Sequence, residues 1–266
     1  MFTKDNKLKR FDFILFFTTI ILSVFGFIII KSATMSKAGG GTGYLKTQII
    51  AFGIGLVIMF VLLIIDYDLY GSLYIPIYVI SILLLIYVLI NPVKALEWGG
   101  VRSWVRIGPV VFQPSEMAKF GVIISLAKFI DINHENINHP LVLIKILAFA
   151  LFPVALILLQ PDLGTALVFI FFIAVMIFIG GVNYKYVTAV LLLGIIFILI
   201  CIGAFFYIMQ DYKVGDNYQF DRIVTFVYPE LDPEDTGYQV IQSKTAIGSG
   251  LLYGRGLYKG VQNQLG

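Results

Sequence analysis

Apolar residues along this chain gather into long blocks that are separated by short polar segments. An α-helix needs about 20 residues to cross the hydrocarbon core of a bilayer, and about 17 to 25 are tolerated. Lipid offers no hydrogen-bond partner to an exposed strand edge, so each block is expected to be helical. Seven blocks can be marked off in this way: residues 13–30, 47–65, 73–90, 117–130, 141–159, 163–181 and 186–209. The pattern predicts an all-α fold, a polytopic transmembrane helix bundle with about seven spans.

A basic segment precedes the first block and contains Lys4, Lys7, Lys9 and Arg10. It could belong to a signal peptide, but the block is long and further spans follow, so we interpret it as a retained anchor. The positive-inside tendency then places the amino terminus in the cytoplasm. Four segments face outward on this topology: 31–46, 91–116, 160–162 and 210 onward. The lysines within 31–46 run against this orientation.

The composition changes after Met209, where about 57 polar, glycine-rich residues follow the last block. We expect residues 210–266 to form a large extracellular loop region of a single integral membrane domain that covers 1–266. Part of this region could be a re-entrant or amphipathic helix, because a helical spacing relates four residues: Tyr238, Ile241, Thr245 and Gly248.

The composition agrees with a membrane protein. Of 266 residues, 59% are hydrophobic and 13% are charged, against about 45–50% and 25% in soluble domains. The net charge of +3 is small and scattered, which argues against a nucleic-acid partner and a polybasic surface patch. The single cysteine, Cys201, lies in an apolar block, so we interpret it as a packing residue.

The segment that leads into the fourth block carries unusual charge. Glu116 and Lys119 are three residues apart, so on a helix that begins near Pro114 they share a face and can form an ion pair. An unpaired charge at mid-membrane costs about 2.5–3.5 kcal/mol, and such residues mostly line functional sites. A local ion pair that only fixes the helix register is the alternative, and we favour the functional interpretation.

Arg102 and Arg106 lie four residues apart in the same outward segment, interleaved with Trp98 and Trp104. Such aromatic and basic residues commonly anchor a loop at the headgroup level of the membrane. Two guanidinium groups at this spacing could equally bind an anion. The spacing alone leaves both interpretations open.

The segment Gln160–Pro161–Asp162 divides two apolar blocks, and Thr165 follows one turn into the second. Asp162 could cap the helix after a tight turn. On the predicted topology it lies on the same membrane side as Arg102 and Glu116, so it could also line a cavity that they share. The sequence supports both roles.

Two further groups of polar residues carry weaker signals. The glycine-rich tail contains Lys244, Arg255 and Lys259, and without other context a flexible surface loop is favoured there over a phosphate site. His134 and His139 lie in an acidic loop with no cysteine nearby, so the sequence has no metal-ligand cluster.

Three segments together resemble a known family in order and spacing: "GGVRSWVRIGPVVFQPSEMAKF", "QPDLGT" and "GYQVIQSKTAIGSGLLYGRGLYKGVQNQL". They are similar to the signatures of the shape, elongation, division and sporulation (SEDS) proteins, the group that contains RodA, FtsW and SpoVE. The stretches "IQSKTAIGSG" and "GVQNQL" resemble the elongation branch, RodA, more than the division branch, FtsW. In "YLKTQ", relatives often have an arginine where Thr47 stands, and Lys46 is the nearest cation.

The resemblance implies a peptidoglycan glycosyltransferase that polymerises lipid II at the outer face of the bacterial cytoplasmic membrane with a class B penicillin-binding protein. It implies about ten spans and a catalytic Asp shortly after the motif "QNQL". That Asp would fall beyond Gly266, so we expect the sequence given to lack it and to be inactive. Asp162 is then a possible assisting residue.

The resemblance also implies substrate contacts. A polyprenyl diphosphate donor needs cations to hold the departing diphosphate, and the residues expected to contact the substrate are Arg102, Arg106, Gln113, Glu116, Lys119, Asp162 and Lys244. Among these, Glu116 is expected to hold Lys119 in place. No cofactor is evident, although a divalent cation such as Mg or Mn could accompany the diphosphate.

Two other functions fit part of this pattern. A lipid II flippase would use the same buried charges, but it typically needs paired inverted repeats, and no repeat is visible. A non-catalytic scaffold for a penicillin-binding protein would explain the aromatic anchors, but it gives no reason for charges at membrane depth.

Overall fold

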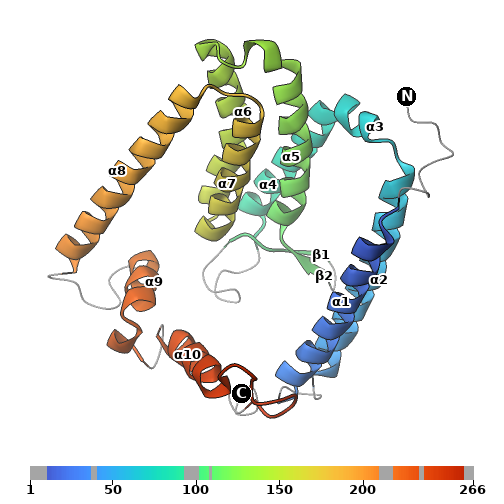
Figure 1. Cartoon of the computed structure of the whole chain (residues 1–266), viewed down its shortest axis with the longest axis vertical. Coiled ribbons are helices and arrows are strands. Elements are labelled where there is room, and N and C mark those ends of the chain that lie inside the picture. The colour runs from blue at the N-terminus through green and yellow to red at the C-terminus, as the bar shows by residue number, and fades with distance from the viewer. Residues whose placement is uncertain are drawn as a thin grey trace. The chain divides into compact units, whose positions relative to one another are not determined.

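The computed structural model describes residues 11–36, 41–92, 102–107, 110–209, 218–233 and 237–260. Its α-helices are α1 (Phe13–Ala33), α2 (Thr42–Ile64), α3 (Tyr67–Ser72), α4 (Tyr74–Ile90), α5 (Pro114–Ile132), α6 (Pro140–Leu158), α7 (Leu163–Ile179), α8 (Tyr184–Ile208), α9 (Tyr218–Val227) and α10 (Tyr238–Gly250). The two strands are β1 (Val105–Ile107) and β2 (Val110–Phe112), and short 3₁₀ turns cover His134–Asn136 and Pro229–Leu231 (Figure 1). The basic residues before position 11, together with Lys37 and Trp98, lie outside the described residues.

Each of the seven predicted spans contains a helix, which confirms the all-α membrane fold. Among the described residues, four helices are long and apolar enough to cross a bilayer: α1, α2, α6 and α8. The apolar helices α4 and α7 have 17 residues each, about 26 Å of helix against a core of about 30 Å. The helix of the fourth span begins at Pro114, as predicted, because the proline suits the first helical turn, and it extends three residues ahead of the apolar block that starts at Met117.

Two short elements were not predicted. The outward segment before α5 contains an antiparallel hairpin in which Val105 pairs with Phe112 and Ile107 with Val110. Between α2 and α4 the chain forms a second short element, the helix α3, which has only six residues. Neither element has the length or the apolar run that marks a membrane span.

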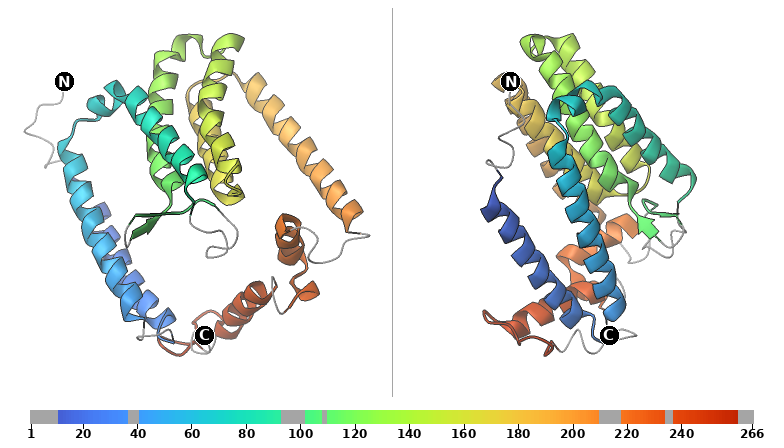
Figure 2. Two further views of the ribbon diagram at one scale, coloured as in Figure 1. Left: turned by 180° about the vertical axis from the view of Figure 1, so that it is seen from behind. Right: turned by 90° about the vertical axis from the view of Figure 1, so that its right-hand side faces the viewer.

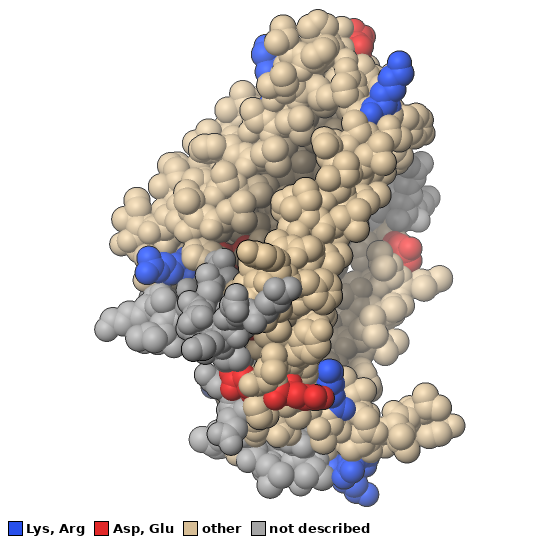
Figure 3. Space-filling model, turned by 90° about the vertical axis from the view of Figure 1, so that its left-hand side faces the viewer, with Lys and Arg blue, Asp and Glu red and all other residues tan. Residues whose placement is uncertain are grey.

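Exposed apolar side chains cover the outer surfaces of the helices. On α7, Phe171 is 71% exposed and Ile179 is 76% exposed, while Phe169 on the same helix is fully buried. On the face shown in Figure 3, charged side chains are few and most of the surface is uncharged. A helix that is apolar on both its buried and its exposed sides is typical of contact with lipid.

The contacts divide the chain into two compact units, which we describe separately. The first consists of residues 1–64 with 205–266, and the second of residues 65–204. In the first unit, α1 and α2 pack through Phe27 and Phe52, whose ring centroids are 5.5 Å apart. The predicted helix in the tail is present as α10, whereas the single-domain organisation stays a prediction.

The second unit contains the buried core. Helices α4, α5, α6 and α7 lie side by side in the views of Figures 1 and 2, and side chains from all four meet in one apolar cluster. Its fully buried members include Leu85 of α4, Leu126 of α5, Ile146 of α6 and Phe169 of α7. This core positions the ends of α5 and α7, where the candidate site lies.

Helices α4 and α5 approach closely through small residues. A Cβ atom at Gly121 of α5 would clash with the Ser81 hydroxyl oxygen of α4. One turn further on, the Ser125 hydroxyl lies 2.8 Å from the Tyr74 carbonyl oxygen of α4 and 2.7 Å from that of Gly121. Small residues and hydroxyl hydrogen bonds of this kind drive helix association in membranes, where lipid removes most of the hydrophobic contribution.

A proline in α6 is compensated by a side chain of α4. Pro153 has no N–H, so the carbonyl of Phe149 four residues earlier lacks its helical donor. The Tyr78 hydroxyl of α4 donates a hydrogen bond of 2.7 Å to this carbonyl. The Tyr78 and Phe149 rings also stack, with centroids 3.8 Å apart. Tyr78 therefore satisfies a backbone acceptor that would otherwise face an apolar environment.

Candidate functional site

Gln113 joins the hairpin to α5 and reaches across to α7. It is the N-cap residue of α5, but its side chain makes no cap hydrogen bond and extends away from the helix. Its Nε2 atom donates to Asp162 Oδ2 at 2.7 Å and lies 3.3 Å from Thr165 Oγ1 and 3.4 Å from Ser103 Oγ. Two N–H groups thus serve three acceptors, of which the carboxylate is the nearest.

Both carboxylate oxygens of Asp162 accept hydrogen bonds. It is the N-cap residue of α7, and its Oδ1 atom accepts a hydrogen bond of 3.1 Å from the Thr165 backbone N–H. Its Oδ2 atom accepts the bond from Gln113. The positive end of the α7 dipole stabilises a negative charge at this position. The structure therefore confirms Asp162 as a helix cap and places it beside the start of α5.

The turn before α7 is tied to its surroundings by Gln160, which is fully buried. Its Nε2 donates to the Leu85 carbonyl of α4 at 3.2 Å, and its own carbonyl accepts from the Arg102 backbone N–H at 3.3 Å. Its side-chain oxygen is buried without a hydrogen-bond partner among the described residues, as is the Ser115 hydroxyl. Polar atoms of this kind are costly at membrane depth and commonly mark functional sites.

Glu116 and Lys119 form the ion pair that their spacing predicts. Lys119 Nζ lies 2.9 Å and 3.1 Å from the two carboxylate oxygens of Glu116. The Lys119 side chain is 23% exposed and that of Glu116 is 55% exposed. A lysine ammonium has three donors, so Lys119 keeps one for a further acceptor such as a phosphate oxygen.

The remaining predicted contacts are less closely tied to this group. Arg102 and Arg106 both expose their side chains on the segment that leads into α5, and Arg106 lies in β1 opposite Val111. Lys244 is exposed on α10 in the other unit, and its role stays a prediction. The structure thus joins Gln113, Asp162 and Thr165 by hydrogen bonds, close in sequence to the Glu116–Lys119 pair.

The sequence did not single out Ser103 or the cross-links of Gln160. Ser103 is fully buried in the segment that the sequence predicts to be an outward loop. The signal for Gln160 was present, because a glutamine at the end of an apolar block is expensive unless its amide is paired. One partner, Leu85, lies 75 residues earlier on α4, and the other, Arg102, lies in the segment before β1. Spacing in the sequence cannot reveal such contacts.

A divalent cation finds no ready set of ligands in the described part of the chain. No three His, Cys, Asp or Glu side chains gather there in a way that could hold a metal ion. The carboxylates of Asp162 and Glu116 already accept hydrogen bonds. The suggested Mg or Mn ion stays a prediction, and no step below depends on it.

The groups at the starts of α5 and α7 are suited to binding an anion and to orienting a hydroxyl group. The Gln113 amide, which is partly buried, fixes the Asp162 carboxylate at the amino terminus of α7, and the Lys119 ammonium is fixed by Glu116 in the first turns of α5. Helix amino termini and cations stabilise anions, and a carboxylate can orient or accept the proton of a hydroxyl group. A site at the end of membrane helices is also within reach of a lipid-linked substrate.

Curated proteins with assigned names are similar to most of the chain. The MrdB peptidoglycan glycosyltransferase of Escherichia coli K12 is 32% identical over all of this chain and 68% of the relative. A Trichlorobacter lovleyi protein named probable peptidoglycan glycosyltransferase FtsW is 30% identical over 97% of this chain and 66% of the relative. The chain therefore spans about two thirds of the length of the curated relatives that it matches.

A solved structure and a family model agree with these relatives. A chain from a peptidoglycan synthase complex, described as coordinating polymerization and crosslinking, superposes with a TM-score of 0.64 at 31% identity. The match covers 88% of this chain and 66% of that one. The family model of FtsW, RodA and SpoVE, described as cell cycle proteins, matches residues 12–266. The chain belongs to this FtsW/RodA/SpoVE family of membrane proteins.

Proposed function

We propose that the protein is a peptidoglycan glycosyltransferase that polymerises lipid II into glycan strands during cell elongation. The observation that carries the proposal is the hydrogen bond between Gln113 and Asp162, which fixes a carboxylate at the start of α7 beside the start of α5. Relatives at 30% and 32% identity are named peptidoglycan glycosyltransferases. The elongation role is supported by the tail motifs "IQSKTAIGSG" and "GVQNQL", which resemble those of RodA.

We place the reaction at the outer face of the bacterial cytoplasmic membrane, with the amino terminus in the cytoplasm. Three of the helices before the hairpin, α1, α2 and α4, are taken as membrane crossings, and this odd number supports a site on the side opposite to the amino terminus. A class B penicillin-binding protein is the proposed partner. The similar chain in a peptidoglycan synthase complex supports this choice.

We assign the roles of the site residues from the charge of each side chain. Lys119, Arg102 and Arg106 hold the diphosphate of the lipid-linked donor, and guanidinium groups suit it because they can bind phosphate oxygens in pairs. Glu116 is a positioning residue, since it fixes Lys119 by two contacts of about 3 Å. Asp162 orients the acceptor sugar hydroxyl, and Gln113 positions Asp162. Lys244 is a further diphosphate contact.

The test is reconstitution of the full-length protein with its penicillin-binding protein and fluorescent lipid II, with glycan strands separated on a gel. We expect Arg102→Ala to reduce the polymerisation rate by about 10- to 100-fold, the effect of losing one charge-assisted contact. Lys185→Ala serves as the matched control, because Lys185 is an exposed cation at the start of α8. Its polymerisation rate should equal that of the wild type.

The same reconstituted vesicles separate the other two functions. Loss of protection from dithionite without glycan strands would indicate a flippase. Binding of the penicillin-binding protein with neither activity would indicate a scaffold. Either result would overturn the proposed glycosyl transfer.

A further inference from the structure

A cavity lies at the end of the helix bundle that is opposite to the Gln113–Asp162 cluster. It has a volume of about 690 Å³ and is bordered by α3 and by the second half of α5. Ligand pockets commonly measure about 300–1,000 Å³. Lys128 follows Glu116 by 12 residues on the same helix, a separation of about 18 Å at 1.5 Å per residue. The cavity and the candidate site therefore lie towards opposite ends of α5.

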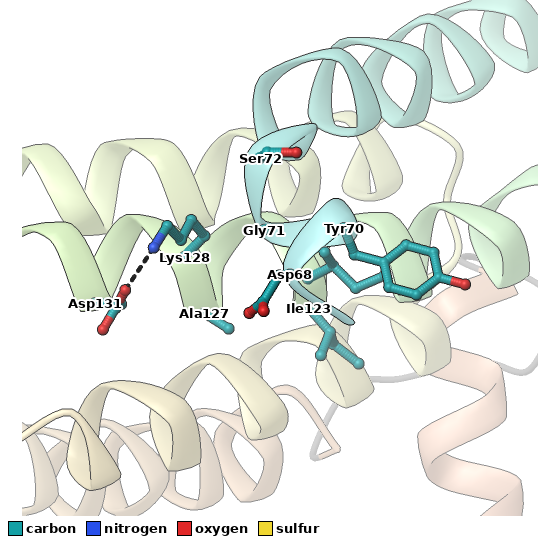
Figure 4. A pocket seen from close by; sticks show the side chains of 9 residues that line it. Asp68, Tyr70, Gly71, Ser72, Ile123, Ala127, Lys128 and Asp131 are labelled. Carbon is teal, nitrogen blue, oxygen red and sulfur yellow. Dashed lines mark hydrogen bonds and ion pairs between the residues drawn. The ribbon is translucent and has the colours of Figure 1, made fainter. Parts of the chain in front are cut away.

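Three charged side chains border this cavity, and they carry both signs. Lys128 Nζ and Asp131 Oδ2 form an ion pair of 2.7 Å, and Asp68 of α3 is a second carboxylate. Figure 4 shows the Asp68 side chain directed from α3 towards the α5 side that carries Lys128 and Asp131, while the Tyr70 ring points the other way. Two carboxylates and one ammonium leave one negative charge unbalanced among these three groups.

The rest of the lining that α5 contributes is apolar and comes from Ile123, Ile124 and Ala127. These residues precede Lys128 on α5, so the apolar surface extends from the charged end of the cavity towards the middle of the membrane. Helix α3 approaches α5 closely here, since a Cβ atom at Gly71 would lie 3.7 Å from Lys128 Cδ. The cavity is thus charged at the membrane surface and apolar below it.

This combination fits one kind of molecule better than the others present in a bilayer. We infer that the cavity binds a phospholipid whose headgroup carries a primary ammonium, as in phosphatidylethanolamine. Its phosphate would pair with Lys128, its ammonium with Asp68 and Asp131, and an acyl chain would cover the apolar lining. Each charge of this zwitterionic headgroup then meets an opposite charge, and the lipid adds no net charge to the cavity.

The donors of the headgroup distinguish this lipid from related ones. A primary ammonium has three N–H donors for carboxylate oxygens, whereas the quaternary ammonium of phosphatidylcholine has none. Phosphatidylglycerol has a phosphate for Lys128 but supplies no cation to the two carboxylates, so the net charge of the cavity disfavours it. On the orientation proposed above, the bound lipid belongs to the cytoplasmic leaflet.

The experiment is native mass spectrometry of the full-length protein after incubation with equimolar mixed micelles of phosphatidylethanolamine, phosphatidylcholine and phosphatidylglycerol with identical acyl chains. We expect retention of phosphatidylethanolamine at least about tenfold above the other two lipids, because a hydrogen bond to a charged group is worth roughly that factor. N-methylated and N,N-dimethylated headgroups should be retained progressively less, since each methyl group removes one N–H.

Substitutions then locate the bound lipid. Asp68→Asn and Asp131→Asn should each reduce the retention of phosphatidylethanolamine about tenfold. Glu135→Gln is the matched control, because Glu135 is an exposed carboxylate in the turn after α5 but does not line the cavity. Its lipid retention should not change.

Equal retention of phosphatidylethanolamine and phosphatidylcholine by the wild type would overturn the inference. Unchanged retention in the Asp68→Asn variant would do the same, provided that the variant shows the thermal unfolding of the wild type. A protein that retains no lipid but binds a lysine-rich peptide in an Asp68-dependent way would also contradict the inference. That result would assign the cavity to a peptide. None of these outcomes depends on polymerisation of lipid II.

Discussion

The hydrogen bond from Tyr78 to the Phe149 carbonyl makes a quantitative prediction about stability. Tyr78→Phe keeps the ring that stacks on Phe149 and removes only the hydroxyl, which is 2.7 Å from the carbonyl oxygen. A buried acceptor left unpaired costs about 1–3 kcal/mol. Hydrogen bonds between membrane helices average about 0.6 kcal/mol, with a maximum near 1.7. We therefore expect Tyr78→Phe to reduce the free energy of unfolding by about 1 kcal/mol.

The proline provides a specific control for this reasoning. In a Pro153→Ala background, residue 153 has an N–H that can bond to the Phe149 carbonyl as in an uninterrupted helix. The cost of Tyr78→Phe should then fall below about 0.5 kcal/mol, so the double-mutant cycle should give a coupling energy of at least about 0.5 kcal/mol.

The assay is reversible unfolding of the full-length protein in mixed micelles titrated with sodium dodecyl sulfate and followed by far-ultraviolet circular dichroism. Tyr87→Phe is a suitable control on the same helix, since Tyr87 is 44% exposed, and it should change the unfolding free energy by less than about 0.5 kcal/mol. An equal cost of Tyr78→Phe in both backgrounds would refute the explanation, because the hydroxyl would then stabilise the fold independently of the proline.

Three further predictions concern packing, the site and a helix end. Gly121→Ala should destabilise the protein by about 1–3 kcal/mol in the same unfolding assay, because its Cβ would clash with Ser81; an unchanged unfolding curve would contradict the close approach of α4 and α5. Gln113→Leu should lower the rate of lipid II polymerisation about 10- to 100-fold by releasing Asp162, and a rate equal to wild type would remove Gln113 from the site. Asp12→Ala should cost about 1 kcal/mol, because its carboxylate caps α1 with a hydrogen bond of 2.9 Å; a change below about 0.3 kcal/mol would show that the cap contributes little.

The membrane fold could be predicted from the sequence because the lipid imposes a simple rule. A helix that crosses a bilayer satisfies its own backbone hydrogen bonds, so a long apolar block is sufficient to identify it. The same rule explains the two omissions. The hairpin Val105–Phe112 and the six-residue helix α3 are held by local hydrogen bonds and contacts, and neither requires an apolar run.

The candidate site could be predicted only in part. The ion pair of Glu116 with Lys119 depends on a spacing of three residues on one helix, which the sequence displays directly. The bond from Gln113 to Asp162 joins residues 49 positions apart, and its existence depends on how α5 and α7 pack. The partner of Pro153 was hidden for the same reason, since Tyr78 lies 75 positions before it on another helix.

The central claim is that the negative charge of Asp162 serves glycosyl transfer. Asp162→Asn tests this most directly, because asparagine is as good a helix cap as aspartate and keeps the shape of the side chain. The measurement is the polymerisation rate of fluorescent lipid II by the full-length variant in complex with its penicillin-binding protein. We predict unchanged thermal unfolding and a rate reduced by about 100-fold or more. A wild-type rate from this variant would contradict the account.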